Sequence, residues 1–326
     1  MGDLPRRRVT PTRPFLNTGV DYAGPIQLRT TKGRGHRSYK AFIAVFVCLS
    51  TRAVHLDVVS DYTADAFLAA LQLFTSRRGL CRSFQSDCGT NFVGADAQLR
   101  ALFSASNPNQ RQIAAQLASE QIQWRFNPPA VPYFGGIWEA AVKSLKHHLR
   151  QVLGENTLTY EEMSTLLAHI EACLNSRPLQ ALSDDPDDIA ALTPGHFLIR
   201  SALNAVPEPN LLESPINCVT QWQLLQKMRD HFWERWSQEY LHSLLQRPKW
   251  WAANDQVRVG RLCLIRSENA PPTRWPLARV TRLHPGEDGS TRVVFVSTAV
   301  SELTRPIAKI ILLPVSDSDA QEEQRA

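Results

Sequence analysis

The sequence lacks the signals of a secreted, membrane-spanning or zinc-binding protein. No apolar run reaches the roughly 18 residues that a membrane span needs, and no apolar segment follows the basic start MGDLPRRRVTPTRPF. The six cysteines are scattered, with no CxxC pair and no His/Cys ligand spacing, so we expect reduced thiols and no structural zinc. The sequence therefore predicts neither secretion nor contact with a membrane.

Charge of one sign is only slightly in excess. The net charge of +5 and the pI near 9.0 favour a polyanionic partner, but many proteins without a nucleic-acid role are equally basic. With 326 residues, 43% of them hydrophobic, the chain is long enough for two domains and a connector. We predict a basic, proline-rich arm over 1–15, a core over 16–200, a helical connector over 201–254, a small β-barrel over 255–314 and a disordered acidic tail over 315–326.

The core has the pattern of an α/β protein with a mixed sheet. Residues 17–28, 39–50 and 51–61 are rich in β-branched and aromatic side chains, which predicts three neighbouring antiparallel strands. A helix over 63–79 then leads into a strand over 81–87, and this crossover makes the sheet mixed. Further predicted elements are helical pieces at 96–103 and 109–121, a short strand near 123–129, and helices at 137–154 and 160–175.

The C-terminal part has a different pattern. Residues 178–215 are irregular and rich in proline, and the connector helix over 219–246 carries an apolar stripe that we interpret as core packing rather than base stacking. Short strands over 255–314 suit a barrel of the SH3 type. The stripe consists of Trp222, Phe232, Trp233, Trp236, Tyr240 and Leu244. The barrel's arginines leave open whether it binds nucleic acid or protein: Arg258, Arg261, Arg274, Arg279, Arg282 and Arg292.

Three acidic residues in the core stand at unusual positions. Asp21 lies within an apolar strand, Asp87 ends a second strand before the turn CGTNF, and Glu139 lies in the first turn of a helix after a glycine pair. If the two strands are adjacent and the helix packs across their ends, the three carboxylates converge. Such a cluster needs cations, and its oxygen ligands suit two Mg²⁺ or Mn²⁺ ions. Two such ions would stabilise the attacking and leaving oxygens of a phosphoryl displacement on a polynucleotide.

The helix after Glu139 carries a row of cations. At 100° per residue, Glu139, Lys143, Lys146 and Arg150 fall on one face, beside an apolar stripe. An acid followed by cations is the arrangement that a DNA strand leaving a catalytic metal would require. The apolar stripe consists of Trp138, Val142, Leu145, Leu149 and Val152.

The segments VDYAGP, SDCGTNFVGA and FGGIWEAAVKSLK resemble the three blocks of retroviral-type integrases with the D,D,E signature. With MGDLPRRRV, LNSRPL, LTPGHFLI, PPTRWPLARV and HPGEDG, they look most similar to the integrases of BEL/Pao-type LTR retroelements over nearly the whole chain. The resemblance implies a ribonuclease H-like, mixed five-stranded core that processes DNA 3′ ends and joins them to target DNA. It implies Asp21, Asp87 and Glu139 as ligands of two Mg²⁺ (or Mn²⁺) ions, and contacts of Lys143 and Lys146 with the element's DNA ends.

The partners expected for this function are the double-stranded DNA of the element ends and of the target. Two element ends must be joined together, so we expect a homo-oligomer. We also expect a nuclear location at the site of integration, after a stage in the cytoplasm before import.

The sequence departs from the resemblance at a few points. The step from Asp87 to Glu139 is 139 − 87 = 52 positions, longer than the retroviral spacing, and we assign the excess to the helical insertion at 96–121. A family integrase would normally begin with a zinc-binding helical domain, and this sequence starts after it. Arg261 stands where an acidic residue is expected, and Arg200 stands where glycine is more usual.

Other interpretations of these residues stay open. Taken singly, each acid could be structural, and the cationic row could be a solvated helix face. We interpret His147 and His148 as surface residues rather than ligands. For function, the alternatives are a non-catalytic or domesticated nucleic-acid-binding relic of an integrase, and a stand-alone nuclease of the same fold.

Overall fold

The computed structural model describes residues 9–33, 35, 37–104, 123–126, 136–183, 185–204, 208, 220–245, 257–267, 270–286 and 291–314, without the side chains of 99–104 and 136–141. The predicted second helical piece at 109–121 and the tail at 315–326 lie outside these residues, as do residues 1–8 of the predicted arm. The chain divides into two compact units, residues 1–174 and 175–326.

The first unit is built on a mixed five-stranded sheet. Its strands run in the order β3-β2-β1-β4-β5, with antiparallel pairing among β1, β2 and β3 and parallel pairing of β1 with β4 and of β4 with β5. This strand order is that of a ribonuclease H-like sheet, so the predicted fold class is confirmed. The strands are β1 (Asn17–Arg29), β2 (Ser38–Cys48), β3 (Val54–Val59), β4 (Ser83–Ser86) and β5 (Gln123–Phe126).

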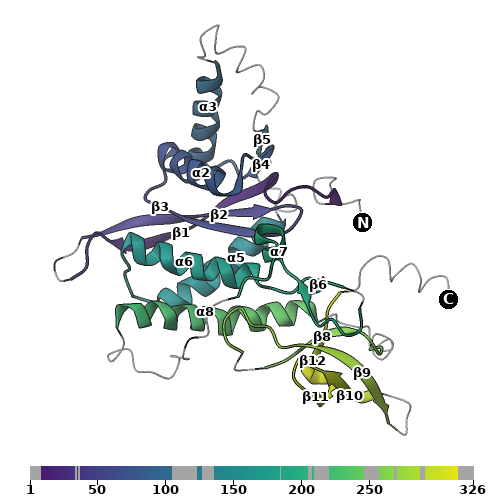
Figure 1. Cartoon of the computed structure of the whole chain (residues 1–326). Coiled ribbons are helices and arrows are strands. Elements are labelled where there is room, and N and C mark those ends of the chain that lie inside the picture. Colours follow the sequence, from purple (N-terminus) through teal and green to yellow (C-terminus); the bar gives the residue numbers. More distant parts are fainter. Residues whose placement is uncertain are drawn as a thin grey trace. The chain divides into compact units, whose positions relative to one another are not determined.

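Helices cover both faces of this sheet (Figure 1). The helices α2 and α3 lie on one face and α5 and α6 on the other. All six residues of β3 are buried, as expected for a strand that is covered on both faces. The helices are α2 (Ala64–Arg78), α3 (Thr90–Ser104), α5 (Gly136–Leu153) and α6 (Tyr160–Asn175).

The observed bounds of α2 and α3 can be compared directly with those predicted from the sequence. Helix α2 has Thr63 as its N-cap, whose side chain accepts a hydrogen bond from the Ala66 amide, and it ends at Gly79 as predicted. Helix α3 begins at Thr90, earlier than the predicted 96, within the segment that we predicted to be a turn. Phe92 and Ala95 explain the difference, because they lie three positions apart and are both buried in the core of the unit.

The second unit contains a helix and a small antiparallel sheet. Its main sheet has the strand order β11-β10-β9-β8-β12. Before it come β6 (Gln180–Ala181), β7 (Ala191–Leu192) and α7 (Pro194–Ile199), none of which was predicted, and α8 (Gln221–Leu244), which was. The strands of the main sheet are β8 (Leu262–Ile265), β9 (Leu277–Pro285), β10 (Thr291–Ser297), β11 (Glu302–Pro306) and β12 (Ile310–Leu312).

One predicted strand of this sheet is in fact two. The run that ends in RPIAKIILLP is interrupted by the 3-10 helix η3 (Ile307–Lys309), which separates β11 from β12. Pro306 precedes η3 and explains the break, because proline has no N–H for a sheet ladder and its fixed φ suits the start of a helical turn.

The aromatic stripe of α8 packs inside the second unit. The rings of Trp233, Trp236 and Tyr240 lie 4.8, 6.0 and 5.5 Å from the ring of Trp275. The Trp233 indole N–H also donates a hydrogen bond to the Ala270 carbonyl. Core packing is therefore confirmed for Trp233 and Trp236, which are buried.

Trp222 and the lengths of the helices complete the description of the fold. Trp222, at the start of α8, is 52% exposed, so including it in the buried stripe was wrong. A position in the first turn can point away from the packed face of a long helix. No described helix is long and apolar enough to span a membrane.

Candidate metal and nucleic-acid site

Asp21 lies on β1, and Asp87 directly follows β4, the strand that pairs with β1. The parallel pairing of β1 with β4 joins Asn17 to Ser83 and ends with Gly19 and Gln85, a constant offset of 83 − 17 = 66 positions. Asp21 and Asp87 have the same offset, 87 − 21 = 66, two positions beyond the last pair. Adjacent strands lie about 4.8 Å apart, so the two carboxylates start from neighbouring backbone positions at one edge of the sheet. The predicted adjacency of their strands is thus observed.

The backbone holds both carboxylates locally. Oδ1 of Asp21 accepts a hydrogen bond from the Tyr22 amide at 2.6 Å, and Oδ1 of Asp87 accepts one from the Gly89 amide at 3.1 Å. The second bond closes the turn that follows β4. Asp87 is exposed and Asp21 is partly buried. Their oxygens are hard ligands of the kind that Mg²⁺ and Mn²⁺ prefer, so this pair fits such ions.

Glu139 is the fourth residue of α5, and α5 packs against β1. The Glu139 side chain lies outside the described residues. Among the described side chains, no group of three His, Cys, Asp or Glu residues is placed to hold a metal ion. The convergence of all three acids therefore stays a prediction.

Sequence reasoning missed the groups that surround Asp87. A Cβ atom added to Gly89 would lie 2.7 Å from Asn91 Oδ1, 3.0 Å from the Tyr62 hydroxyl and 3.1 Å from Asp87 Oδ1. These three polar groups thus crowd one point, and only glycine fits there. Burial raises the pKa of Tyr62, and the nearby charges of Asp87 and Asp21 raise it further. Tyr62 therefore stays a hydrogen-bond donor beside the two carboxylates.

Asn91 is the second missed residue. It is 2% exposed, and among the described residues neither polar atom of its side chain forms a hydrogen bond of ordinary geometry. The Tyr22 hydroxyl is also buried, and it interacts with the Asn91 side chain. Burial raises the pKa of Tyr22, which stays protonated. Buried polar groups without ordinary hydrogen bonds are rare, and here they lie next to Asp87. Their sequence signal was present in SDCGTNF, but only the fold brings Tyr62 and Tyr22 to it.

The cationic face of α5 is exposed as its pattern predicted. Lys143, Lys146 and Arg150 are exposed, whereas the apolar residues Val142, Leu145 and Leu149 are each no more than 2% exposed. The prediction for the two histidines of this helix is wrong in part. His147 is exposed, but His148 is 5% exposed, because it follows the apolar stripe around the helix.

Several arginines of the small sheet have structural partners. Arg279 is buried and donates hydrogen bonds to the Gly260 and Asp188 carbonyls, and Arg261 donates one to the Leu313 carbonyl. Arg282 pairs with Glu302 at 3.3 Å. These arginines are therefore already engaged within the unit, so their number is a poor indication of binding.

Comparisons with known proteins give limited results. A family of unknown function (DUF5641) matches residues 220–313, which comprise α8 and the small sheet. No curated protein matches the chain. A solved chain of the simian T-cell lymphotropic virus intasome, in complex with PP2A regulatory subunit B56 gamma, is 11% identical and has a TM-score of 0.37. The match covers 93% of this chain and 80% of that one. At this TM-score the likeness carries no argument, and the fold assignment above comes from the strand order.

Proposed function

We propose that this chain is a metal-dependent polynucleotidyl transferase of the retroelement integrase type, which processes DNA 3′ ends and joins them to target DNA. The observation that carries the proposal is the parallel pairing of β1 with β4, whose register brings Asp21 level with Asp87, the residue after β4. The helix that carries Glu139 packs on the first of these strands. Two acids at one sheet edge, followed by an exposed row of cations on a neighbouring helix, suit the phosphates of a polynucleotide.

Each group has a role in this proposal. Asp21, Asp87 and Glu139 would hold the metal, which when bound supplies charge stabilisation to the attacking and leaving oxygens of the phosphate. Tyr62 would donate a hydrogen bond to an oxygen beside Asp87, because its hydroxyl stays protonated there. Lys143, Lys146 and Arg150 would hold the DNA backbone and so position the reacting phosphate. Joining two ends to chromosomal DNA would require a homo-oligomer and place the activity in the nucleus, after a stage in the cytoplasm.

The test is joining of a labelled double-stranded oligonucleotide end to plasmid DNA in Mg²⁺ or Mn²⁺, with the terminal sequence of the parent element. We compare the unmodified chain with Asp87→Asn and Glu139→Gln, and use Asp65→Asn as the matched control. Asp65 is an exposed acid of α2 whose Oδ1 accepts a hydrogen bond from Gln98, and asparagine retains that acceptor. We expect both site variants to lose joining and the control to retain it.

Other outcomes separate the rival functions. Cleavage of DNA without joining, lost in both site variants, would assign a nuclease. DNA binding that persists in all variants with no cleavage and no joining would assign a non-catalytic relic. The chain is assigned as a relic only if cleavage and joining are still absent after a zinc-binding helical domain of the family is added. That control excludes a requirement for an upstream domain.

A further inference from the structure

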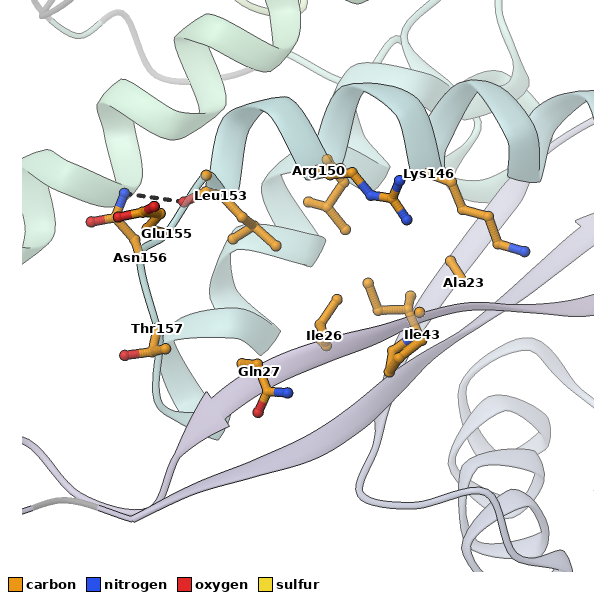
Figure 2. A pocket seen from close by; sticks show the side chains of 14 residues that line it. Ala23, Ile26, Gln27, Ile43, Lys146, Arg150, Leu153, Glu155, Asn156 and Thr157 are labelled. Atoms are coloured by element: carbon orange, nitrogen blue, oxygen red, sulfur yellow. Dashed lines mark hydrogen bonds between the residues drawn. The ribbon is translucent and has the colours of Figure 1, made fainter.

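A cavity of about 280 Å³ lies between β1 and the C-terminal half of α5 (Figure 2). A bulge in β1, which has one extra residue opposite β2, brings Ile26 to the face that lines it. Lys146 and Arg150 stand at the end of the cavity near Ala23. The cavity therefore adjoins the cationic row of the candidate site and belongs to that site.

The second unit has an open groove of its own, with a volume of about 940 Å³. It lies where the end of β8, the start of β9 and the edge strand β11 meet the loop before β7. Its most deeply buried lining residue is Ile265, which belongs to the core of the small sheet. Its walls are half-buried apolar residues: Ile189, Trp275, Pro276, Leu277 and Leu303. Apolar side chains that stay together and half open after folding are typical of a surface that a partner covers.

The rims of the groove are held in place by hydrogen bonds. In the turn from β10 to β11, the Thr298 amide donates to the Ser301 carbonyl, and the Thr298 hydroxyl accepts from the amides of Val300 and Ser301. Val300 lines the groove from this turn and is 95% exposed. The loop before β7 is held by Arg279, which donates a hydrogen bond to the Asp188 carbonyl. The groove is thus formed before any ligand binds, which lowers the entropy cost of binding.

Two arginines give the groove its charge. Arg266 is exposed and Arg305 is half-buried, and within the described part of the chain neither forms an ion pair with a carboxylate. Arg305 donates one hydrogen bond, to the carbonyl of its neighbour Thr304. With Asp187, two arginines and one aspartate leave the lining with a charge of +1. Arginine binds carboxylates through paired hydrogen bonds, so an acidic ligand fits here.

The edge of β11 offers backbone groups to an extended chain. Among the described strands, β11 pairs only with β10, and it forms one edge of the small sheet (Figure 1). Leu303 and Arg305 lie on one face of β11, opposite Val296 and Val294, and both line the groove. A peptide that adds to this edge places every second side chain on that face. An apolar side chain beside Leu303 and a carboxylate beside Arg305 then form two favourable cross-strand pairs.

A peptide fits this groove better than a nucleic acid does. A strand of duplex DNA has a phosphate about every 3.4 Å and binds to rows of cations. The groove has two arginines, the carboxylate of Asp187 and mostly apolar walls, so most phosphates along a strand would find no cation there. A ligand with both apolar and acidic side chains matches the walls and the arginines together.

We propose that this groove is a docking site for an acidic, apolar peptide of a partner protein, which binds as an added strand on β11. The peptide has an apolar residue and an acid two positions apart. Arg305 pairs with this acid, and Arg266 pairs with a second carboxylate of the peptide. The proposal is independent of the proposed function, because the groove lies within the second unit and none of its residues belongs to the candidate metal site.

The test selects ligands of the full chain from a phage library of random 12-residue peptides. We expect enrichment of sequences with an apolar residue and an Asp or Glu two positions apart. The same selection is made with the double variant Arg266→Glu, Arg305→Glu, for which Lys or Arg should replace the acid. The matched control is Arg82→Glu, Arg125→Glu, which reverses two exposed arginines of the first unit and should select the same peptides as the unmodified chain.

Fluorescence anisotropy with a labelled selected peptide measures the contribution of each feature. Moving the acid by one position turns it to the other face of an added strand, and should weaken binding about fivefold at unchanged composition. Val300→Glu places a like charge on the rim at a position that is 95% exposed, and should weaken binding up to about fivefold. Arg266→Glu alone, also at an exposed position, tests the charge in a variant that folds even if the double variant does not.

The outcomes separate the docking site from other uses of the groove. A consensus that changes the sign of its charge with the double variant, and stays the same in the control, supports the proposal. No enriched consensus, or one that the double variant leaves unchanged, overturns it. Loss of DNA duplex affinity in the double variant without a peptide consensus would assign the groove to nucleic acid instead. Tighter binding of a peptide of residues 314–326 than of every selected sequence would assign it to the chain's own tail.

These results do not depend on the joining test. The peptide selection uses no metal and no DNA end, and Asp87→Asn should select the same consensus as the unmodified chain. Joining that depends on Asp87 would stand if the docking site failed, and the docking site would stand if joining failed.

Discussion

Replacing Asp87 by asparagine should stabilise the metal-free first unit. The register of β1 against β4 brings Asp21 level with Asp87, which directly follows β4, so their like charges repel when no cation lies between them. Two unit charges about 4 Å apart repel by about 1 kcal/mol in water. The water value applies because Asp87 is exposed. In a chelator, Asp87→Asn should therefore raise the free energy of unfolding of the first unit by about 1 kcal/mol.

Mg²⁺ should reverse this ranking. A ligand that binds only the folded state at 100 times its dissociation constant adds about 2.7 kcal/mol to stability. The unmodified chain should gain this amount, whereas Asp87→Asn loses a charged ligand and should gain little. Asp87→Asn should therefore stabilise the first unit in chelator but leave it less stable than the unmodified chain in Mg²⁺. This pattern is expected of a residue that serves function rather than stability.

Hydrogen exchange followed by mass spectrometry is the suitable assay, because peptides from β1 and β2 report the first unit separately from the second. Exchange is measured in chelator and in saturating Mg²⁺ for the unmodified chain, Asp87→Asn and the control Asp65→Asn. Asp65→Asn should behave as the unmodified chain does. Equal Mg²⁺ stabilisation of all three proteins, or a less stable Asp87→Asn in chelator, would refute the reasoning.

Three further predictions concern other parts of the chain. Gly89→Ala should cost about 1–3 kcal/mol and weaken Mg²⁺ stabilisation, because its Cβ would clash with Asn91 Oδ1 at 2.7 Å and crowd the Asp87 carboxylate at 3.1 Å, and hydrogen exchange with and without Mg²⁺ measures both effects. His55→Gln should remove a pH dependence of stability, measured by urea unfolding between pH 5.5 and 8.5. His55 is buried between Asp57 at 2.9 Å and Glu171 at 3.0 Å, and these bonds outweigh burial and raise its pKa. Arg200→Gly should stabilise the second unit by about 1 kcal/mol in urea unfolding, because Arg200 ends α7 at φ +61°, where glycine is unstrained.

The sign of the His55 prediction follows from its raised pKa. The folded state binds the imidazole proton more tightly, so the stability from His55 is fully present below pH 6.5, the unfolded value, and is lost as the pH rises through the folded pKa. Arg77 and Arg78 also contact Asp57 and Glu171, so they keep part of the carboxylate charge neutralised in the variant. A His55→Gln protein that loses stability with pH as steeply as the unmodified chain would contradict the prediction.

Controls for the other two substitutions are available nearby. Gly33→Ala has open space around its Cβ but a positive φ, so it introduces backbone strain, which Gly89→Ala does not, without touching the candidate site. It should leave Mg²⁺ stabilisation intact, in contrast to Gly89→Ala. A less stable Arg200→Gly would show that the Arg200 side chain contributes more than its backbone strain costs.

The sequence predicted the strands, most helices and the acids because these depend on local patterns. Apolar runs and β-branched residues marked β1 to β4, and Thr63 and Gly79 marked the ends of α2. The start of α3 was missed, because the turn-forming residues before Phe92 outweighed its burial in the local pattern. The split of the last strand at Pro306 was likewise visible only once β12 was paired with β8. The sequence marked Arg200 as unusual, but only the structure shows its left-handed backbone conformation.

The sequence by itself determined which residues carry chemistry: two strand acids, a helix acid and a row of cations on α5. Only the tertiary structure decided that Asp21 and Asp87 are level, because register depends on which strands pair. Only it brought Tyr62 and Tyr22 to the segment that holds Asp87 and Asn91, and only it opened a cavity beneath Lys146 and Arg150. One extra residue in β1 sets the face of Ile26, and no local periodicity reveals it, because a bulge is defined by the strand opposite.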